Sequence, residues 1–200
     1  SINRICIEND IDILIPGVDE ELIPLSELKS QNKFKVLLPS LDFIKLHLNK
    51  LTSNEFLINK KLPAPKVIRA DQGNINFPCI VKPINGRGSR NVFLANNESE
   101  VNAQIILSRK KRNEFILQEY IKGQEFTVNI SSDKNGKLKA IVPVLVNIKK
   151  GITISADLSK DKEVINACEK IHKANPEEGC YNIQLIKDKN GLIKPFEINP

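Results

Sequence analysis

The sequence predicts an α+β fold, with helices packed on antiparallel sheets and a short piece of parallel sheet before them. Pairs of short apolar runs joined by turn residues recur from residue 115 to the end of the chain, as in β-hairpins. Within residues 11–38, an apolar run, a helical segment and a second apolar run follow one another, as in a parallel βα repeat. Segments with apolar residues at helical spacing separate these units.

The chain of 200 residues is long enough to bury a substantial core in one or two domains. Its formal net charge of +6 would suit an anionic ligand or a nucleic acid. However, the lysines are spread along the chain, and the only basic run, residues 109–112, is expected to close the helix before it. The few aromatic residues mostly fall in apolar core patterns, which argues against a nucleic-acid binder.

The cysteines have no CxxC spacing and no clustered histidines beside them, so we expect buried free thiols and no thiolate metal site: Cys6, Cys79, Cys168 and Cys180. His47 and His172 are isolated and are expected on helix surfaces. No apolar segment approaches the length of a membrane span, and no signal peptide is recognisable. A cytoplasmic location without a membrane partner is therefore expected.

The chain contains no methionine, not even at position 1. It also stops at Pro200, directly after its last predicted strand. We therefore expect a fragment of a longer protein, cut at both ends.

The first part of the chain reads as one parallel βα repeat. Residues 4–10 look like the tail of a helix, and residues 11–15 form an apolar strand stopped by Pro16 and Gly17. A helix with an acidic first turn follows, and residues 35–38 form a second strand. The apolar side of that helix is expected to be Leu22, Leu25 and Leu28.

Two helices join this repeat to the rest of the chain. Ser40 is expected to cap a helix that runs to about residue 49, with an apolar face made of Leu41, Ile44 and Leu48. A helix over residues 52–60 should turn Phe56 and Leu57 inward, and Lys50 lies at the joint. We place a domain boundary within residues 48–65, so that residues 1–48 end a parallel-sheet domain and residues 49–200 form a second, C-terminally truncated one.

The segment over residues 77–94 organises the second domain. Residues 66–70 and 78–81 are expected to be strands, and Lys82 ends the latter. The loop over residues 85–89 has glycines two residues apart, which allow backbone N–H groups to turn toward one anion before a strand at residues 91–95. It matches neither a Walker A loop nor a dinucleotide fingerprint. For the loop taken by itself, an ordinary hairpin connection with a solvated lysine beside it is the preferred interpretation.

The remaining elements alternate between helices and hairpins. Ser99 is expected to cap a helix whose apolar side is Val101, Ile105 and Ile106. A strand over residues 115–121 leads into another over residues 125–131. The later elements are a turn at residues 133–136, a returning strand at 137–146, a helix at 160–173, and a terminal hairpin of residues 181–186 and 192–198.

The terminal hairpin carries a candidate metal site. Alternation along the last strand places Glu197 and Asn199 on one face, with Phe196 and Ile198 on the other. Gln184 can lie almost opposite Glu197 across the hairpin. One carboxylate and two amide oxygens suit magnesium when phosphates and water supply its other ligands. The alternative is the ordinary solvated face of a sheet.

The segment over residues 118–121 could pair its backbone with a purine edge, while Tyr120 and Ile121 offer apolar contact. Glu125 follows the bend at Gly123, where its carboxylate could accept hydrogen bonds from a ribose. A solvated hairpin rim is the alternative, and for Glu119 taken singly it is the preferred one.

These groups, in this order, resemble the ATP-grasp superfamily. The resemblance rests on the segments PCIVKP and GRGSRNV, then LQEYIKGQEFTV, GCYNIQL and KPFEINP, within residues 50–200. Upstream, IDILIPGVDEEL resembles the pre-ATP-grasp segment of the carbamoyl-phosphate-synthase-like branch. The resemblance implies an ATP-grasp fold, in which two α+β subdomains clamp a nucleotide, preceded by the remnant of an α/β pre-ATP-grasp domain.

The resemblance also implies roles for individual residues. Lys50 and Lys82 would contact the phosphates of ATP, and residues 86–89, with Gly86, Gly88 and Ser89 among them, would form a mobile lid over the phosphates. Gln118, Glu119 and Ile121 would hold adenine, and Glu125 the ribose. Gln184, Glu197 and Asn199 would hold one or two Mg²⁺ ions, with Mn²⁺ as an alternative. Gln184 departs from the pattern, since many members carry a glutamate there. The arginine that usually follows the terminal Asn-Pro lies beyond the end of the sequence.

The activity implied is an ATP-dependent ligase that activates a carboxylate as an acyl phosphate for attack by an amine or a similar nucleophile. Its substrates would be a small carboxylate and a small amine, without nucleic acid. No catalytic base can be named, and the oligomeric state is open, with a homodimer as one option. A catalytically inactive nucleotide-binding module and a nucleic-acid binder are the alternatives.

Overall fold

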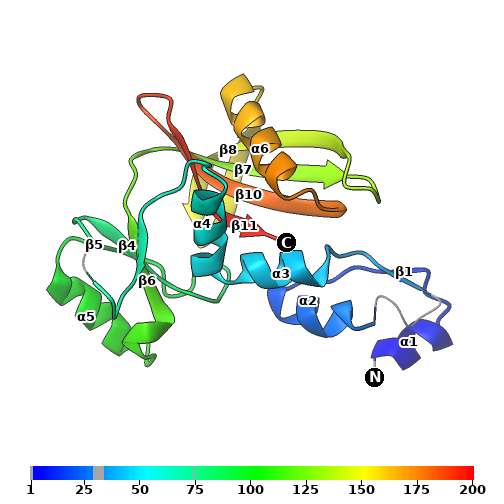
Figure 1. Ribbon diagram of the computed structural model, residues 1–200. Coiled ribbons are helices and arrows are strands. Elements are labelled where there is room, and N and C mark those ends of the chain that lie inside the picture. The colour runs from blue at the N-terminus through cyan, green and yellow to red at the C-terminus, as the bar shows by residue number, and fades with distance from the viewer. Residues whose placement is uncertain (1, 29–33, 74) are drawn as a thin grey trace.

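The computed structural model describes residues 2–28, 34–73 and 75–200 (Figure 1). They form a two-stranded parallel sheet, a four-stranded antiparallel sheet and a five-stranded antiparallel sheet, each with helices beside it. This confirms the α+β fold with a piece of parallel sheet at its start. No helix in the described ranges is long and apolar enough to cross a membrane.

The N-terminal unit contains the predicted βα repeat. Its elements are α1 (Ile2–Glu8), β1 (Ile13–Leu14), α2 (Asp19–Ser26), β2 (Lys35–Val36) and α3 (Leu41–Leu48). The two strands pair in parallel, with Leu14 opposite Val36. Its core is made of Cys6, Leu22, Leu25, Phe34, Val36, Leu38 and Ile44.

Helix α3 links this unit to the five-stranded sheet. The Ser40 side chain caps it, as predicted, by accepting a hydrogen bond from the Phe43 N–H at 3.3 Å. The predicted apolar face is only partly right, because the fully buried residues of α3 are Phe43, Ile44 and His47. The helix packs on two cores at once, with Ile44 in the N-terminal core and Phe43 in the core of the five-stranded sheet.

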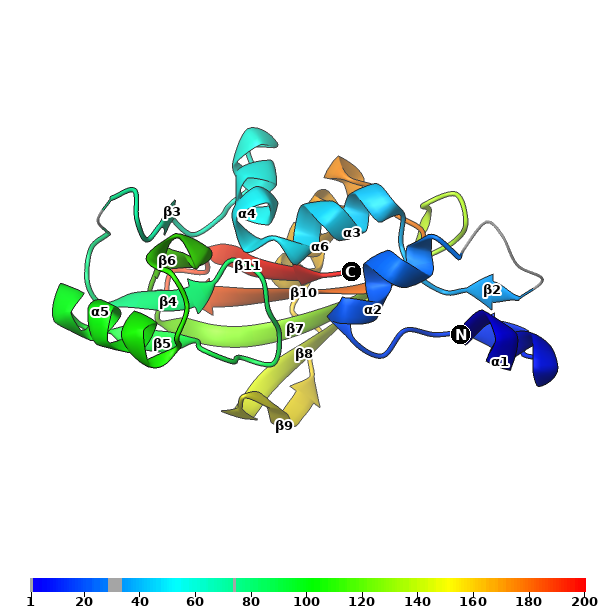
Figure 2. The ribbon, with the colours of Figure 1, turned by 90° about the horizontal axis from the view of Figure 1, so that it is seen from below.

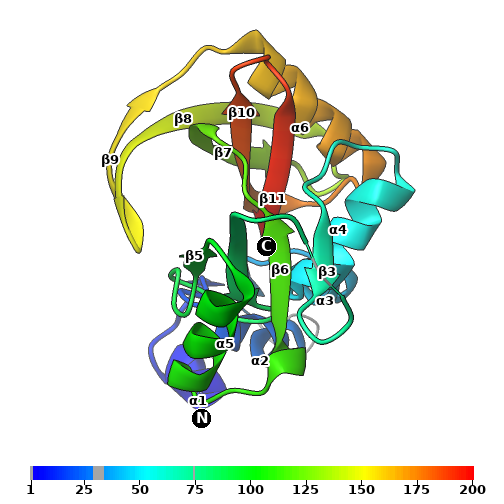
Figure 3. The same cartoon turned by 90° about the vertical axis from the view of Figure 1, so that its left-hand side faces the viewer.

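The four-stranded sheet carries the glycine loop. It contains β3 (Val67–Arg69), β4 (Cys79–Pro83), β5 (Phe93–Ala95) and β6 (Phe115–Glu119), in the order β3-β6-β4-β5. Helix α5 (Glu98–Leu107) packs on it (Figures 1 and 3). Its core is made of Ala70, Ile75, Cys79, Val81, Ala95, Val101, Ile105, Phe115 and Leu117.

Three expectations for α5 and its surroundings are wrong. The cap is Asn97, which accepts a hydrogen bond from the Glu100 N–H at 3.0 Å, and Ser99 lies inside the helix. Ile106 is 75% exposed, because Val101 and Ile105 already define the buried stripe and Ile106 lies about 100° further round the helix. The basic run does not close α5, which ends at Leu107; instead, Arg112 begins the 3₁₀ turn η1 (Arg112–Glu114).

The five-stranded sheet is antiparallel throughout, in the order β11-β10-β7-β8-β9. Its strands are β7 (Gly123–Ser132), β8 (Leu138–Lys150), β9 (Ile152–Leu158), β10 (Gly179–Asp188) and β11 (Ile193–Asn199). Helices α4 (Lys50–Asn59) and α6 (Lys162–Ala174) lie beside this sheet (Figure 1). Its core includes Leu57 of α4 and Val164 and Cys168 of α6. Strand β9 was not predicted. It is an edge strand with almost every side chain exposed, so it lacks the apolar signal of a buried strand.

Both histidines are buried, contrary to the prediction. His172 is 3% exposed; its ring bridges the Tyr181 hydroxyl at 2.9 Å and the Gly136 carbonyl at 2.8 Å. His47 is also 3% exposed and lies 2.9 Å from the Ser53 hydroxyl, and burial lowers the pKa of its imidazole to about 4. The buried faces of α3 and α6 extend to the last turn of each helix, so both histidines lie on the side of the helix that faces the protein interior.

Three of the four cysteines are buried free thiols, as predicted: Cys6, Cys79 and Cys168. Burial raises the pKa of the Cys168 thiol to about 12. Cys180 is exposed, because it precedes the buried Tyr181 on β10 and alternation turns it to the open face of the sheet.

The two larger sheets face each other, and the glycine loop lies between α2 and the curved β8–β9 hairpin (Figures 2 and 3). The turn between β8 and β9 reaches the loop, where the Ser89 hydroxyl donates to the Gly151 carbonyl at 2.8 Å. The fold therefore encloses a space between the two sheets.

Candidate functional site

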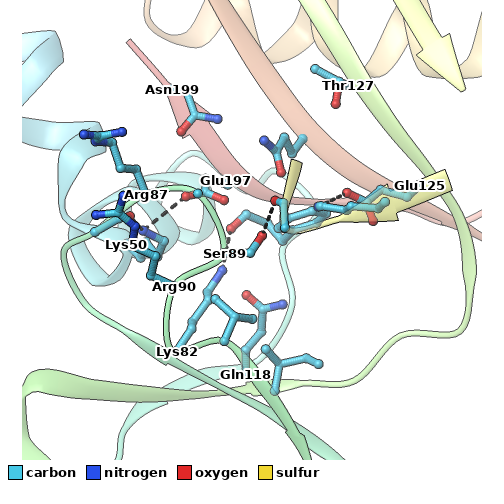
Figure 4. A pocket seen from close by; sticks show the side chains of 18 of the residues that line it. Lys50, Lys82, Arg87, Ser89, Arg90, Gln118, Glu125, Thr127, Glu197 and Asn199 are labelled. Atoms are coloured by element: carbon cyan, nitrogen blue, oxygen red, sulfur yellow. Dashed lines mark hydrogen bonds and ion pairs between the residues drawn. The ribbon is translucent and has the colours of Figure 1, made fainter. Parts of the chain in front are cut away.

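One cavity of about 560 Å³ lies between the two larger sheets (Figure 4). All the candidate residues of the sequence analysis line it: Lys50, Lys82, Gly86, Gly88, Ser89, Gln118, Glu119, Ile121, Glu125, Gln184, Glu197 and Asn199. Residues from six elements, namely α4, β4, β6, β7, β10 and β11, thus share one space with the glycine loop, although they are up to 149 positions apart in the chain.

Two buried lysines join the glycine loop to the terminal hairpin. Lys82, 4% exposed at the end of β4, donates to the Phe196 carbonyl on β11 at 3.1 Å. Lys50, 8% exposed at the start of α4, donates to the Gly86 carbonyl at 2.6 Å and pairs with the Glu197 carboxylate at 3.1 Å. The predicted convergence of the two regions on one cavity is therefore present.

Burial lowers the pKa of the Lys82 ammonium to about 8, although Glu197 opposes the shift. Lys82 also lies 5.3 Å from the ring centroid of Phe196. Within the described part of the chain, the Lys82 ammonium donates a hydrogen bond only to a neutral carbonyl, so the charge of this buried lysine is only partly compensated. An anion in the cavity would supply the missing compensation.

The glycine loop has the backbone that its sequence requires. Gly86 and Gly88 have φ angles of 137° and 64°, a region that residues with a Cβ rarely adopt. The loop is held on both sides, because Arg87 pairs with Glu20 of α2 at 2.7 Å and Ser89 bonds to the β8–β9 turn. The loop thus covers one side of the cavity.

The far end of the cavity contains an unpaired amide oxygen. Gln118 of β6 is 4% exposed, and its Oε1 atom has no hydrogen-bond partner among the described residues. A buried acceptor of this kind costs about 1–3 kcal/mol unless a donor reaches it. Tyr120 and Ile121, which follow Gln118 in the chain, also line the cavity. This end of the cavity therefore offers one hydrogen-bond acceptor, the Gln118 Oε1 atom, beside apolar surface.

Glu119 and Glu125 are both ion-paired. The Glu119 carboxylate accepts two bonds from Lys194 of β11 at 2.8 Å and one from the Lys66 N–H at 3.0 Å, so it also ties the two sheets together. Glu125 of β7 pairs with Lys149 near the tip of β8, and Lys149 lies 5.8 Å from the Phe196 ring centroid. Both carboxylates remain part of the cavity wall.

The terminal hairpin has the predicted register. Gln184 lies directly opposite Glu197, and Asn182 lies opposite Asn199. Asn199 donates its Nδ2 to the Asn182 Oδ1 at 3.0 Å, which leaves the Asn199 Oδ1 available as an acceptor. In the described ranges, no three His, Cys, Asp or Glu side chains gather at a metal-binding distance. The oxygen set here is one carboxylate and two amides, which fits Mg²⁺ only if a ligand supplies further oxygens.

The predicted placement of Phe196 is wrong. A β-bulge pairs Leu185 with Pro195 and Gln184 with Glu197, so Phe196 has no residue opposite it. The bulge interrupts the alternation, and Phe196 lines the cavity together with Glu197, while Ile198 stays in the core.

The sequence analysis did not identify several residues that line the cavity: Asp19, Arg90, Thr127, Lys149 and Asn182. Asp19 stands in the first turn of α2, and burial raises the pKa of its carboxyl in spite of the nearby Lys50. The helix dipole accounts for acidic residues in the first turn of α2, and nothing in the neighbouring sequence indicates that Asp19 lies in the cavity. Arg90 could have been suspected, because it directly follows the glycine loop.

The comparisons with known proteins agree with this geometry. The family described as "ATP-grasp in the biosynthetic pathway with Ter operon" matches residues 111–200, and the RimK-like ATP-grasp domain matches residues 43–130. A biotin carboxylase from Campylobacter jejuni, solved as a β,γ-ATP complex, has a similar fold, with a TM-score of 0.79 and 17% identity over 99% of this chain and 50% of that one. The chain belongs to the ATP-grasp superfamily.

Sequence relatives are D-alanine–D-alanine ligases. The one from Fusobacterium nucleatum is 33% identical over 150 residues, which cover 69% of this chain and 50% of the relative. The one from Petrotoga mobilis is 29% identical over 120 residues, 57% of this chain and 40% of the relative. The D-alanine–D-alanine ligase from Bacillus anthracis, solved with ATP, aligns with a TM-score of 0.70 and 18% identity over 99% of this chain and 71% of that one. The chain thus spans half or less of the length of these two sequence relatives.

Proposed function

We propose that this chain is the nucleotide-binding part of an ATP- and Mg²⁺-dependent carboxylate–amine ligase. The observation that supports this most strongly is the meeting of Lys50 and Lys82 with the glycine loop and with Glu197 in one cavity. Two buried cations beside a glycine loop suit a polyphosphate, and the nearby carboxylate and amide oxygens suit its metal ion.

In this proposal, the triphosphate of ATP lies over Lys50 and Lys82, under Gly86, Gly88 and Ser89. The adenine lies at the other end of the cavity, beside Gln118, Glu119 and Ile121. Its amino group would donate to the unpaired Oε1 of Gln118. The ribose hydroxyls would bond to Glu125, which shares its carboxylate with Lys149.

Gln184, Glu197 and Asn199 would hold the Mg²⁺ ion, or Mn²⁺ in its place, together with phosphate oxygens and water. The ion would screen the charge that gathers on the phosphate oxygens. Glu197 already pairs with Lys50, so the same carboxylate would face a lysine on one side and the ion on the other.

The chemistry proposed is activation of a small carboxylate by the γ-phosphate of ATP. The acyl phosphate formed is then attacked by a small amine or a similar nucleophile. Phosphoryl transfer needs mainly alignment and compensation of charge, which Lys50, Lys82 and Arg90 are placed to supply. We assign no general base. Among the relatives and neighbours, D-alanine–D-alanine ligases and an L-amino acid ligase carry names of this reaction type, whereas the carbamoyl-phosphate-synthase-like branch remains a prediction.

The second candidate is a nucleotide-binding module without catalysis. Gln184 favours it, because this glutamine leaves a single protein carboxylate, Glu197, at the metal site, and Lys50 also binds that carboxylate. Such a module would bind Mg²⁺-ATP without consuming it.

Calorimetry with Mg²⁺-ATP and an assay for phosphate release test these candidates together. A ligase should bind Mg²⁺-ATP and release phosphate only when a carboxylate and an amine are both added. Binding without carboxylate-dependent phosphate release would support the inactive module. Absence of Mg²⁺-ATP binding would contradict both candidates.

A further inference from the structure

Three Asn-Gly pairs occur in the chain: Asn85-Gly86, Asn135-Gly136 and Asn190-Gly191. All three asparagines are exposed and lie in connections between strands. The main-chain nitrogen of a glycine can attack the side-chain amide of the asparagine before it, because glycine has no Cβ to hinder the approach. The attacking nitrogen must be free, so the structure decides which of the three pairs can react.

The glycine nitrogens of the two later pairs are held in tight turns. The Gly136 N–H donates to the Asp133 carbonyl at 2.8 Å, and the Gly191 N–H donates to the Asp188 carbonyl at 3.0 Å. In each turn, the carboxylate of the same aspartate also accepts a hydrogen bond from the asparagine N–H, at 3.0 and 2.8 Å respectively. Attack by either glycine nitrogen requires its turn to open and a hydrogen bond to be lost, which slows the reaction.

The Gly86 nitrogen is not held in this way. Within the described part of the chain, it donates no hydrogen bond, and the Asn85 side chain makes none. Gly86 is exposed, and a Cβ built on it would meet nothing nearer than the Pro83 side chain at 4.0 Å. The Ile84 carbonyl accepts from the Lys50 N–H at 3.0 Å, and the Gly86 carbonyl accepts from the Lys50 ammonium at 2.6 Å. The peptide between Asn85 and Gly86 is therefore a free span between two anchored carbonyls.

Positive charge lies beside this peptide. The Lys50 ammonium contacts the Gly86 carbonyl, and Figure 4 shows Lys50, Arg87 and Arg90 close together on this side of the cavity. The Gly86 nitrogen must lose its proton before it attacks, and nearby cations favour the deprotonated form of a group. The surroundings of Gly86 therefore favour the reaction.

We propose that Asn85 is a site of spontaneous deamidation, at which the Gly86 nitrogen attacks the Asn85 side chain and the product weakens ATP binding. The Gly86 nitrogen gives its proton to water and bonds to the Asn85 Cγ atom, which closes a succinimide ring. The bond from Cγ to the side-chain nitrogen breaks, and its electron pair leaves with that nitrogen, which takes up a proton and departs as ammonia. Water then opens the ring at either of its two carbonyl carbons. One opening gives aspartate at position 85, and the other gives isoaspartate, in which the main chain runs through the side-chain carbon.

Either product places a new carboxylate beside the cations of the glycine loop. That carboxylate would compete with the phosphates of ATP for Lys50 and Arg87. Isoaspartate also lengthens the main chain by one carbon directly before Gly86, whose carbonyl is the one that Lys50 holds. The deamidation follows from the structure of the loop alone, whereas its effect on ATP rests on the proposed function.

Peptide mass spectrometry of the whole chain, aged at mildly alkaline pH, measures the three sites in one sample. We expect Asn85 to deamidate about tenfold faster than Asn135 and Asn190, because no hydrogen bond of the attacking nitrogen has to be lost first. The two slower asparagines are internal controls, since each is also exposed and followed by glycine. Equal rates at the three sites, or a slower rate at Asn85, would overturn the modification site.

Asn85→Gln is the matched variant. It keeps the side-chain amide but would have to close a larger ring, so residue 85 should stay intact during ageing. Calorimetry compares each aged sample with the fresh sample of the same variant. We expect the Mg²⁺-ATP affinity of the parent chain to fall about tenfold once Asn85 has converted, and that of Asn85→Gln to stay within about twofold. Conversion of Asn85 without a loss of affinity would overturn the proposed effect on ATP.

The two measurements separate this inference from the proposed function. If the fresh parent chain does not bind Mg²⁺-ATP, the proposed function fails, and the three deamidation rates still decide the modification site. If the fresh chain binds Mg²⁺-ATP and Asn85 is not the fastest site, the modification site is wrong and the nucleotide site stands.

Discussion

Two cavities, the first described above and a second of about 420 Å³, share one sheet and differ in what faces it. Strands β7, β10 and β11 contribute to both. The first cavity is also covered by β4, the glycine loop and the β8–β9 turn, which bring Lys82, Arg87, Arg90 and Lys149. The second is lined by the five-stranded sheet and the residue that follows it. The sheet thus supplies an oxygen-rich surface, and the elements folded over it decide where positive side chains gather.

The largest effect is expected for Lys82→Ala, which removes the most deeply buried cation of the first cavity. We expect Mg²⁺-ATP affinity to fall about a hundredfold, or ~3 kcal/mol, because a buried charged contact to phosphate is lost. Calorimetry measures the affinity, and circular dichroism reports the fold. Lys170→Ala, on the exposed side of α6, should leave the affinity unchanged. Similar affinities in the two variants would contradict the placement of the phosphates.

The pH dependence of Mg²⁺-ATP affinity gives a second test of the role of Lys82 in the first cavity. Burial lowers the pKa of Lys82 to about 8 from an ordinary value of 10.5. In the free protein, Lys82 loses its charge above pH 8, so Mg²⁺-ATP affinity should fall about tenfold by pH 9. Lys82→Arg keeps its charge and should show a flat profile over this range.

Stability should change in the opposite sense across the same pH window. Between pH 8 and 10.5, the unfolded chain holds a proton on Lys82 that the folded chain has released, so this group makes the free energy of unfolding rise with pH. Denaturant titrations with and without the Lys82→Met change would isolate this contribution. A parent chain that loses affinity and stability together, with no difference from Lys82→Met, would argue against a depressed pKa.

A smaller effect is expected for Glu197→Gln, which changes the carboxylate that pairs with Lys50 in the first cavity. Loss of this carboxylate should weaken ATP binding about tenfold with Mg²⁺ present and much less with Mg²⁺ removed, because it is the carboxylate of the proposed metal site. Calorimetry in Mg²⁺ and in EDTA gives the two affinities. Glu55→Gln, on the exposed face of α4, is the matched control. An equal loss in both buffers would mean that Glu197 acts only through Lys50.

The smallest effect is expected for Glu20→Gln, which frees Arg87 of the glycine loop. The pair lies at the surface, so Mg²⁺-ATP affinity should fall only about twofold at low salt. The difference should vanish in 1 M salt, where screening is nearly complete. Glu27→Gln, just after α2, should have no effect at either salt concentration. A difference that persists at 1 M salt would show that Glu20 acts by more than charge.

Part of this site could be predicted from local sequence. Lys82 at the end of a strand, the glycines at positions 86 and 88, and Gln184 opposite Glu197 follow from strand alternation and backbone torsion, which operate over a few residues. The resemblance then joined these separate signals into one nucleotide site. The same local rules failed at Phe196, because a bulge breaks the alternation on which the prediction depended.

Other parts depend on contacts between distant segments. His47 and His172 are isolated polar residues in the sequence, yet both are buried because their helices pack on the five-stranded sheet. Strand β9 has no apolar stripe, and only its pairing with β8 makes it a strand. In each of these cases, the prediction was wrong or missing because the segments that pack or pair with the residue or strand lie far away in the sequence.

The sequence by itself determined the order of most of the elements, the backbone torsion of the glycine loop and the oxygen face of the terminal hairpin. These properties are set by torsion and by the period of two along a strand, so a few neighbouring residues suffice. Only the tertiary structure decided that Asp19, Arg90 and Lys149 join the same cavity, and that another part of the five-stranded sheet lines a second one. Burial and charge compensation depend on which surfaces meet, and that is fixed only when the whole chain has folded.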